Sequence, residues 1–558
     1  MHSRFFRKRV LALLLLITTT ISFAQTYKYE PYRSEVTPTK NVIVMIPDGT
    51  SMGVVSSARL YKSYNGLGAS LNIDPYLCGS VITFSSNAPI GDSAPTTSCY
   101  MTGMPQQTGN VSLYPVADAV NDLVVVDPEM AYQPLATILE AARIEKGKAV
   151  GLVVTCEFPH ATPADCAAQY PRRSDYAAIA SQMAYQNLDI MFGGGVSFVS
   201  EDMKAHFADK GIAYIENDLT AFRRLSQGRA WALFEARDLP YELDRNPDKT
   251  PSLEEMTKKA LDILSMHENG FFLMVEGSKV DWAAHANDAV GAITEFIAFD
   301  NAVGAAIDFA KKEGNTTVII LPDHGNSGFT LGRRDLRGYD SATINQLFGT
   351  VSKYKKTAEG LEKILLEVKP DDIKATVKQY TEIEITEEEY LKLLNARNYP
   401  AEGYTKTEVT QDMQATLVEI MNQRTYFGFT TGGHTGEEVF LAAYHPRHNI
   451  PFGVNTNIEI NHYLQDILGL QTKLPELTRS IFAKHTEIFK GYQITIDKSN
   501  SEQHPVLVVV SGGKKLEIPA FKSVAYLNGE PLEVGSVVVY ISDNETFYLP
   551  AALSELMR

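Results

Sequence analysis

Short runs of almost uninterrupted apolar residues recur along the first 450 positions of the chain. Such runs lie at 41–46, 148–155, 188–192, 271–275, 315–321 and 439–444. Strands that are buried on both faces show this pattern, because a parallel sheet covered by helices has no solvated side. The runs predict an α/β fold with three αβα layers around a large, mostly parallel central sheet.

A charged segment at 333–430 interrupts this pattern. Its polar and apolar positions predict helices at 357–368 and 386–395, and Thr386 with Glu389 matches a capping box. We interpret the segment as a helical subdomain inserted into the main domain.

The last part of the chain, 492–558, has a different pattern of apolar and polar residues. Short apolar runs at 506–510 and 537–541 predict strands, and Asn528-Gly529 is a strong hairpin signal. We expect a small β-rich module that follows a catalytic domain at 25–490.

The N-terminus predicts export. A basic start is followed by the apolar stretch 10–21 and by Ser22-Phe23-Ala24, so residues 1–24 are interpreted as a signal peptide. The mature chain is then expected to be periplasmic or secreted, with no membrane span. Its net charge, −16 before the basic leader is removed, argues against nucleic-acid binding. A disulfide between Cys156 and Cys166 stays open at this stage.

Side chains that can bind metals or attack phosphorus follow the apolar runs. They are Asp48, Ser93, His160, Thr162, Glu276, Asp281, His285, Asp323, His324 and His434. Taken singly, each has an ordinary interpretation: Ser93 reads as the N-cap of a helix, and Asp48 as a turn residue. Asp281 and His285 are four residues apart, so a helix places both on one face.

The residue types point to more than one metal. Mixed carboxylate and imidazole ligands suit zinc, whereas Asp, Thr and Glu oxygens suit magnesium. Two metals about 4 Å apart clamp the attacking and leaving oxygens of an in-line displacement.

In combination these motifs resemble the alkaline phosphatase family between about residues 41 and 470. The shared motifs are Pro-Asp-Gly, Asp-Ser-Ala, His-Ala-Thr-Pro, Val-Glu-Gly-x-x-x-Asp-x-x-x-His, Asp-His and His-Thr-Gly. The resemblance implies two zinc ions and one magnesium ion, with Ser93 as the nucleophile. It assigns the first zinc to Asp281, His285 and His434, the second to Asp48, Asp323 and His324, and magnesium to Asp48, Thr162 and Glu276.

The family also grips phosphate with an arginine. Its spacing from Thr162 points to Arg173, with a one-residue uncertainty because Arg172 is adjacent. His160 and Trp282 stand at two variable positions beside the third metal, where other members carry Asp and Lys or His. The stretch from Leu233 to Leu253 also resembles members that bind a fourth metal, calcium, but we assign no such site because Thr250 occupies the place of an aspartate, and its presence stays open.

The resemblance further implies a homodimer and a crown-like role for the insertion near the mouth of the site. The C-terminal module weakly resembles an amine-oxidase-type N-terminal domain of envelope proteins, so either envelope contact or simple packing is expected of it.

The predicted function is hydrolysis of small phosphate monoesters through a phosphoserine. The alternatives are a phosphodiesterase or sulfatase on the same scaffold, or a metal- and phosphate-binding envelope protein without turnover. A sulfatase is disfavoured, because Thr97 stands where its maturation motif needs arginine.

Overall fold

The computed structural model describes residues 36–398 and 412–558. The signal-peptide prediction for residues 1–24 therefore lies outside the described residues, as does a short part of the insertion. The chain divides into two units, 1–34 and 35–558, and everything below concerns the second.

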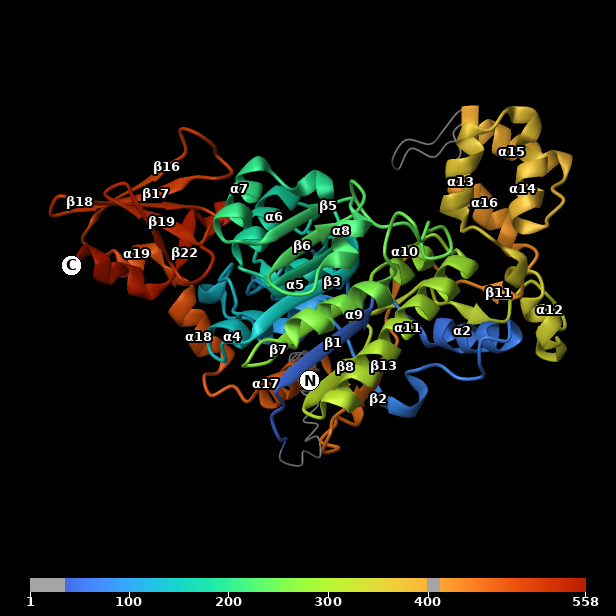
Figure 1. The fold of residues 1–558 in the computed structure, drawn as a ribbon, viewed down its shortest axis with the longest axis horizontal. Coiled ribbons are helices and arrows are strands. Elements are labelled where there is room, and N and C mark those ends of the chain that lie inside the picture. Colours follow the sequence, from blue (N-terminus) through green and yellow to red (C-terminus); the bar gives the residue numbers. More distant parts are fainter. Residues whose placement is uncertain (1–35, 399–411) are drawn as a thin grey trace, which may run out of the picture. The chain divides into compact units, whose positions relative to one another are not determined.

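A ten-stranded sheet forms the centre of this unit (Figure 1). In spatial order its strands are β14 (Gly453–Thr456), β2 (Leu77–Ile82), β13 (Val439–Tyr444), β8 (Thr316–Ile320), β1 (Asn41–Pro47), β7 (Phe271–Gly277), β3 (Ala149–Glu157), β4 (Ile190–Gly194), β6 (Ala230–Leu233) and β5 (Ala213–Glu216). β13 runs antiparallel to both of its neighbours, and every other described pair in this sheet is parallel. The predicted α/β fold with a mostly parallel sheet is confirmed.

Strand β1 shows why the apolar runs have no polar positions. Val42, Val44 and Ile46 pack into the hydrophobic cluster on one face of the sheet. Ile43 and Met45 pack into the cluster on the other face. Side chains alternate across a strand, so a strand covered on both sides must be apolar throughout.

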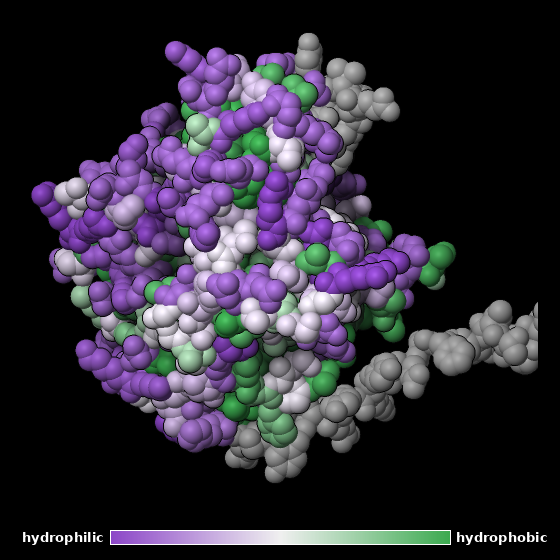
Figure 2. Space-filling model, turned by 90° about the vertical axis from the view of Figure 1, so that its right-hand side faces the viewer, coloured by the Kyte–Doolittle hydropathy of each residue, from purple (hydrophilic) through white to green (hydrophobic). Residues whose placement is uncertain are grey.

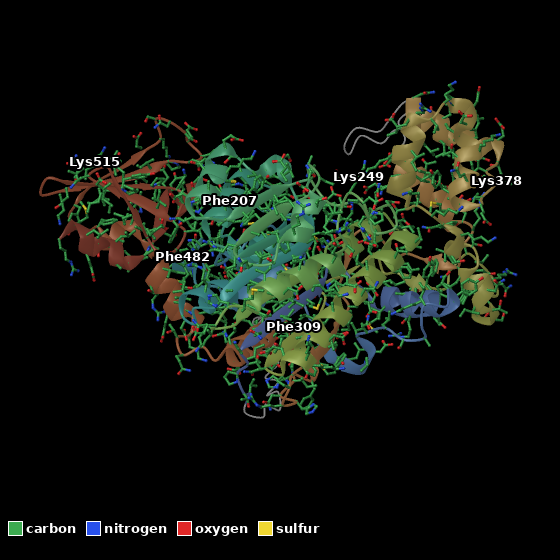
Figure 3. All side chains as sticks on the ribbon, viewed as in Figure 1. Phe207, Lys249, Phe309, Lys378, Phe482 and Lys515 are labelled. Atoms are coloured by element: carbon green, nitrogen blue, oxygen red, sulfur yellow. The ribbon has the colours of Figure 1, made fainter. Side chains whose placement is uncertain are left out.

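Helices cover both faces. One layer contains α2 (Met52–Tyr64), α9 (Leu253–Leu264) and α11 (Ala289–Glu313), and the other contains α3 (Ser93–Thr102), α4 (Ile138–Ile144), α5 (Ala161–Ala167), α6 (Tyr176–Tyr185), α7 (Glu201–Asp209) and α17 (Asn457–Leu468). The short α8 (Leu219–Arg224) and α10 (Lys279–His285) flank the strands. Aromatic side chains fill these layers: Phe207, labelled in Figure 3, packs 4.8 Å from Trp231 between ring centroids.

Among the described residues α11 is the one helix long and apolar enough to cross a membrane by length and composition. Its apolar window is 72% buried, and it packs on α9, α10 and α2. The core of the fold therefore accounts for its hydrophobicity.

The inserted helices are α12 (Ile344–Phe348), α13 (Ala358–Glu367), α14 (Ile373–Thr381), α15 (Glu387–Asn398) and α16 (Met413–Asn422). Thr386 and Glu389 do form the reciprocal bonds of a capping box. Two short ribbons lie at the base of the insertion: β9 (Gly325–Asn326) pairs with β12 (His434–Thr435), and β10 (Thr330–Leu331) pairs with β11 (Phe427–Gly428). Figure 2 views the molecule from the side of these helices and shows a mostly hydrophilic surface with scattered apolar patches.

Beyond α18 (Leu474–Ile481), the chain forms two small antiparallel sheets, and α19 (His485–Ile488) lies between their first two strands in the sequence. The larger contains β16 (Gln493–Asp497), β17 (Val506–Ser511), β18 (Lys514–Pro519), β19 (Val524–Leu527) and β20 (Glu530–Glu533). The smaller contains β15 (Ala483–Lys484), β22 (Thr546–Leu549) and β21 (Val539–Ile541). Asn528 and Gly529, both at positive φ, make the predicted hairpin turn between β19 and β20.

Candidate active site

Ser93 is the first residue of helix α3, and the preceding residue is the N-cap. The Asp92 carboxylate accepts a hydrogen bond from the Ser93 amide at 2.8 Å, so our prediction of Ser93 as the N-cap was wrong by one position. Because Asp92 does the capping, the Ser93 hydroxyl is free to face Asp48 Oδ1 at 3.5 Å and His324 Nε2 at 3.2 Å.

Helix α3 is held firmly in the site. All ten of its residues are buried. The Tyr100 hydroxyl donates to the Pro322 carbonyl at 2.9 Å, which ties the helix to the loop that carries Asp323 and His324. Asn461 of α17 donates to the Tyr100 carbonyl from the other side. The position of Ser93 relative to that loop is therefore fixed by buried hydrogen bonds.

Asp48, Asp323 and His324 form one candidate metal group, and all three are fully buried. Asp48 follows β1 and the other two follow β8, so neighbouring parallel strands deliver them to the same edge of the sheet. Gly49 is required here: its φ is +62°, and a Cβ would lie 2.2 Å from Asp281 Oδ1.

The electrostatics of this group favour a bound cation. Burial raises the pKa of Asp48 well above its ordinary value, and the charges of Asp323 and Asp281 raise it further. Burial opposes protonation of His324, but Asp323 and Asp48 raise the pKa of its imidazole well above the usual range. Buried carboxylates this close need a positive partner, and a divalent cation supplies one.

Asp281, His285 and His434 form a second candidate group. As predicted, Asp281 and His285 lie one turn apart on α10, with 3.3 Å between Oδ2 and Nε2. His434 comes from β12, and its Nε2 lies 3.1 Å from that of His285. Two ring nitrogens so close need a shared proton or cation between them.

Backbone carbonyls orient two of the rings. The Nδ1 of His285 donates to the Gly432 carbonyl at 2.8 Å, and the Nδ1 of His324 donates to the Gly325 carbonyl at 3.0 Å. Each Nε2 thereby faces the candidate metal position and can donate its electron pair to a cation once it carries no proton. Burial and the nearby His324 lower the pKa of His434 to about 4, which keeps that ring neutral.

The predicted third group of Asp48, Thr162 and Glu276 stays a prediction, and two further side chains lie beside Glu276. Glu276 lies within 4.8 Å of both Cys156 and His160, measured between ligand atoms, whereas Asp48 belongs to the group with Asp323 and His324. Thr162 is buried on the same short helix α5, and its hydroxyl has no hydrogen-bond partner. Burial, with the charge of Asp323, raises the pKa of Glu276 to about 8.

Trp282 packs against this third group. Its ring lies edge-on to His160 with 5.6 Å between centroids. Burial and the charge of Arg173 lower the pKa of His160 to about 3, so its ring is neutral.

Orphaned polar atoms show that the donors fit cations. Asp48 Oδ2, Thr162 Oγ1, Glu276 Oε1 and His160 Nδ1 are buried without hydrogen-bond partners. Because Asp48 Oδ1 faces Ser93 and His324 while Oδ2 is unpartnered, this carboxylate has a free oxygen for a second ion. Buried unpaired oxygens are costly, so a bound cation would account for the cluster.

The two adjacent arginines face different neighbours. Arg173 donates to Asp92, beside Ser93, and its second nitrogen lies 3.3 Å from His160 Nε2. Arg172 instead binds Asp543 of the C-terminal module. Burial acts to raise the pKa of Asp92, but the charges of Arg173 and His324 outweigh it and keep the carboxyl ionised.

Three site residues were missed in the sequence. Asp92 holds Arg173, Asn326 donates to Asp281 Oδ1 at 2.7 Å, and Cys156 lies beside Glu276. Asp92 is the first residue of the Asp-Ser-Ala motif and Asn326 follows the Asp-His motif closely, so a search of the motifs and their neighbours for further acids and amides would have found them. Cys156 and Cys166 are free thiols, as are Cys78 and Cys99, so the disulfide left open above does not form.

Comparisons with known proteins agree on one family. The profile described as alkaline phosphatase matches residues 39–470. Alkaline phosphatase 3 of Bacillus subtilis is 33% identical over 435 residues, covering 75% of this chain and 87% of that protein. The repressible alkaline phosphatase of Saccharomyces cerevisiae is 27% identical, covering 88% of this chain and 91% of its own.

Solved structures give the same result. The crystal structure of Thermus thermophilus alkaline phosphatase matches with a TM-score of 0.67 at 25% identity, covering 79% of this chain and 93% of that one. The cold-active enzyme from Shewanella sp. matches with a TM-score of 0.66 at 25% identity, covering 77% and 99%.

Proposed function

The chain belongs to the alkaline phosphatase family of metal-dependent phosphomonoester hydrolases, and we propose that it acts through a phosphoserine formed at Ser93. The observation that carries this proposal is that the Ser93 hydroxyl faces Asp48 and His324 of one candidate metal group. The His324 ring lies 4.1 Å from that of His434 in the other group, and Arg173 binds Asp92 next to Ser93. No single motif brings these side chains together, because they come from distant parts of the chain.

We propose zinc for the two groups that combine carboxylates with imidazoles and magnesium for the third. The first zinc would be held by Asp281, His285 and His434, the second by Asp48, Asp323 and His324, and magnesium by Asp48, Thr162 and Glu276. When bound, such cations neutralise the carboxylates, lower the pKa of a serine hydroxyl and polarise phosphoryl oxygens. The free Oδ2 of Asp48 and the unpaired Thr162 hydroxyl support this assignment. Cys156 and His160 add sulfur and nitrogen ligands beside Glu276, so the third site also suits an ion that prefers such ligands to oxygen.

The chain's own residues then perform an in-line displacement. Ser93 Oγ gives its proton to solvent and forms a bond to phosphorus while the bond from phosphorus to the alcohol oxygen breaks, and that oxygen takes a proton from water as the alcohol leaves. Water hydrolyses the resulting ester, which restores the Ser93 hydroxyl and releases inorganic phosphate. Ser93 stands at the N-terminus of α3, where the helix dipole favours developing negative charge.

Arg173 is proposed to bind the phosphoryl group through two N–H donors. A guanidinium matches two phosphate oxygens better than an ammonium does. Asp92 keeps the guanidinium beside Ser93 before substrate arrives. A phosphate diester has one free phosphoryl oxygen fewer than a monoester, so binding of two such oxygens by Arg173 favours monoesters.

The test is Ser93→Ala in the metal-loaded enzyme. Turnover of a chromogenic phosphate monoester should fall by about 10³-fold or more and the burst of alcohol should vanish, while metal content stays unchanged. Ser57→Ala is the matched control, because that buried hydroxyl has no partner and lies on α2. Near-normal turnover in Ser93→Ala would refute the proposal.

Comparing substrates tests the phosphodiesterase alternative. Arg173→Ser should reduce kcat/KM for the monoester far more than for a diester of the same alcohol. An equal loss for both substrates would favour the diesterase.

Export to the periplasm or medium, homodimer formation and envelope contact by the module at 492–558 are also proposed. The domain limits 25–490 and 333–430 belong to the same proposal. Light scattering of the purified mature chain measures the oligomeric state, and fractionation of the producing cells measures its location.

A further inference from the structure

The segment between α5 and α6, residues 168–175, carries Arg173 but has little structure of its own. From the catalytic side its start is held by Gln169, which exchanges hydrogen bonds with Gln182 of α6. Nearer Arg173 it is held by backbone bonds to one loop: Tyr170 pairs with Val111, and the Arg173 amide donates to the Gly109 carbonyl at 2.8 Å. The alignment of Arg173 therefore depends on what contacts the rest of this segment.

The C-terminal module contacts it at two points. Arg172 Nη1 lies 3.2 and 3.1 Å from the two carboxylate oxygens of Asp543, and its Nη2 donates to Ser542. The Tyr170 ring packs edge-on against Phe521, with 5.8 Å between centroids. Phe521 is fully buried, and its carbonyl accepts a bond from Ser181 of α6, the helix that the segment enters.

The side chains of the consecutive residues Arg172 and Arg173 therefore bind different parts of the molecule. Arg172 binds the module, whereas Arg173 binds Asp92 beside Ser93. The module lies beyond residue 470, where the match to the family profile ends. It is therefore an addition to the family fold that reaches the phosphate side of the site.

We propose that the C-terminal module positions Arg173, with Asp543 and Phe521 as the positioning residues that hold the segment 168–175. The inference rests on the proposed role of Arg173 in binding phosphate. On this view the module is part of the working enzyme, and its removal would loosen the phosphate grip without touching the nucleophile or the metal ligands.

The test compares Asp543→Asn with Glu533→Gln. Both acids belong to the module and pair with a cation of the catalytic part, Asp543 with Arg172 and Glu533 with Lys210. Lys210 follows α7 and lies away from the segment, so Glu533→Gln removes an equivalent interface charge without altering the support of Arg173. Asp543→Glu is the conservative variant.

Inorganic phosphate is the probe, and its affinity is measured by calorimetry on the metal-loaded Ser93→Ala protein, which needs no turnover. Asp543→Asn should weaken phosphate binding about two- to fivefold, the range set by one partly exposed ion pair. In the Ser93 enzyme the same change should raise KM for a monoester by a similar factor with little change in kcat. Asp543→Glu should restore both values, and Glu533→Gln should alter neither.

A double-mutant cycle completes the test. Because Asp543 acts through Arg172, Arg172→Gln combined with Asp543→Asn should weaken phosphate binding no more than either change alone. Equal affinities for Asp543→Asn and Glu533→Gln, or additive losses in the cycle, would overturn the inference. Failure of the proposed function is a separate result: the wild-type enzyme would then lack monoester turnover whatever the phosphate affinities.

Discussion

The inserted helices and the C-terminal module are both additions to one central sheet, but they extend opposite faces of it. Apolar residues of the insertion, such as Phe348 and Leu361, belong to the cluster that contains α9 and α11. Apolar residues of the module, such as Leu507 and Tyr540, belong to the cluster that contains α4 and α5. Neither addition is a loosely attached appendage, because each completes a hydrophobic core.

The polar contacts of the two additions border different chemistry. The insertion is anchored where Asp244 and Asp288 accept bonds from the start of α13, and Asn422 donates to the Asn287 carbonyl, two residues from His285. The module instead meets the segment that carries Arg173. The insertion therefore adjoins the proposed metal ligands, whereas the C-terminal module adjoins the arginine proposed to bind phosphate.

Removing the metals is expected to give the largest difference between the insertion side and the C-terminal module. Chelation is expected to abolish turnover, and it should speed hydrogen exchange at the ribbon of β9 and β12, because buried carboxylates nearby lose their counter-charge. Exchange in β16–β20 should not change. Mass spectrometry of exchanged peptides, before and after chelation, measures both effects, and a uniform change across the chain would contradict the comparison.

Truncating one buried aromatic in each addition is the next largest test. Phe521→Ala and Phe348→Ala both remove fully buried rings, and each should lower the free energy of unfolding by about 3–5 kcal/mol. Only Phe521→Ala should also weaken phosphate binding, because only Phe521 packs on Tyr170. Denaturant unfolding and phosphate calorimetry distinguish the outcomes; a phosphate defect in Phe348→Ala would erase the distinction.

The anchor of the insertion offers a smaller effect. Asp244→Ala leaves the Thr357 amide and hydroxyl without their acceptor and should cost about 1–3 kcal/mol of stability. Faster hydrogen exchange should be confined to α13 and its neighbours. Asp371→Ala, an exposed acid in the same insertion, is the control and should leave both the unfolding midpoint and the exchange unchanged.

The last prediction concerns a pH dependence on the insertion side of the sheet. Burial raises the pKa of Glu295 to about 8, although Lys279 partly offsets this. Since the folded pKa exceeds the unfolded value, the folded protein holds the proton more tightly, and stability falls as pH rises between about 4 and about 8. Glu295→Gln should remove this loss and raise the unfolding midpoint at pH 9 by a few degrees.

Calorimetric scans from pH 5 to pH 9 measure that difference. The exposed Glu268→Gln is the control and should keep the wild-type slope. Parallel curves for the wild type and Glu295→Gln would show that this carboxyl does not titrate in the range.

Much of the fold could be predicted because its signals are local. The apolar runs that form β1 and β7 could be recognised without knowing their neighbours, because a strand buried on both faces is apolar at every position. Asp281 and His285 could be placed on one face of a helix from their spacing alone. The reversed direction of β13 could not be predicted, because an apolar run does not reveal which way a strand runs.

The parts of the site that escaped prediction depend on long-range contacts. Spacing pointed to Arg173 with a one-residue uncertainty, and the different partners of the two arginines, Asp92 for Arg173 and Asp543 for Arg172, distinguish them. Asp92, and not Ser93, caps the helix, because the extended backbone at Asp92 directs its carboxylate toward the Ser93 amide. Both residue types are good N-caps, so their sequence order could not decide between them.

The ribbon of β9 and β12 has a consequence for how this enzyme changes over time. It joins Asn326 to His434, so the long stretch between them enters and leaves the fold at one point. Doubling the length of such an excursion costs only about 0.6 kcal/mol in loop-closure entropy. Changes in the length of this stretch therefore cost little in loop-closure entropy as long as its apolar residues in the core are kept, and the ligands on either side stay where they are.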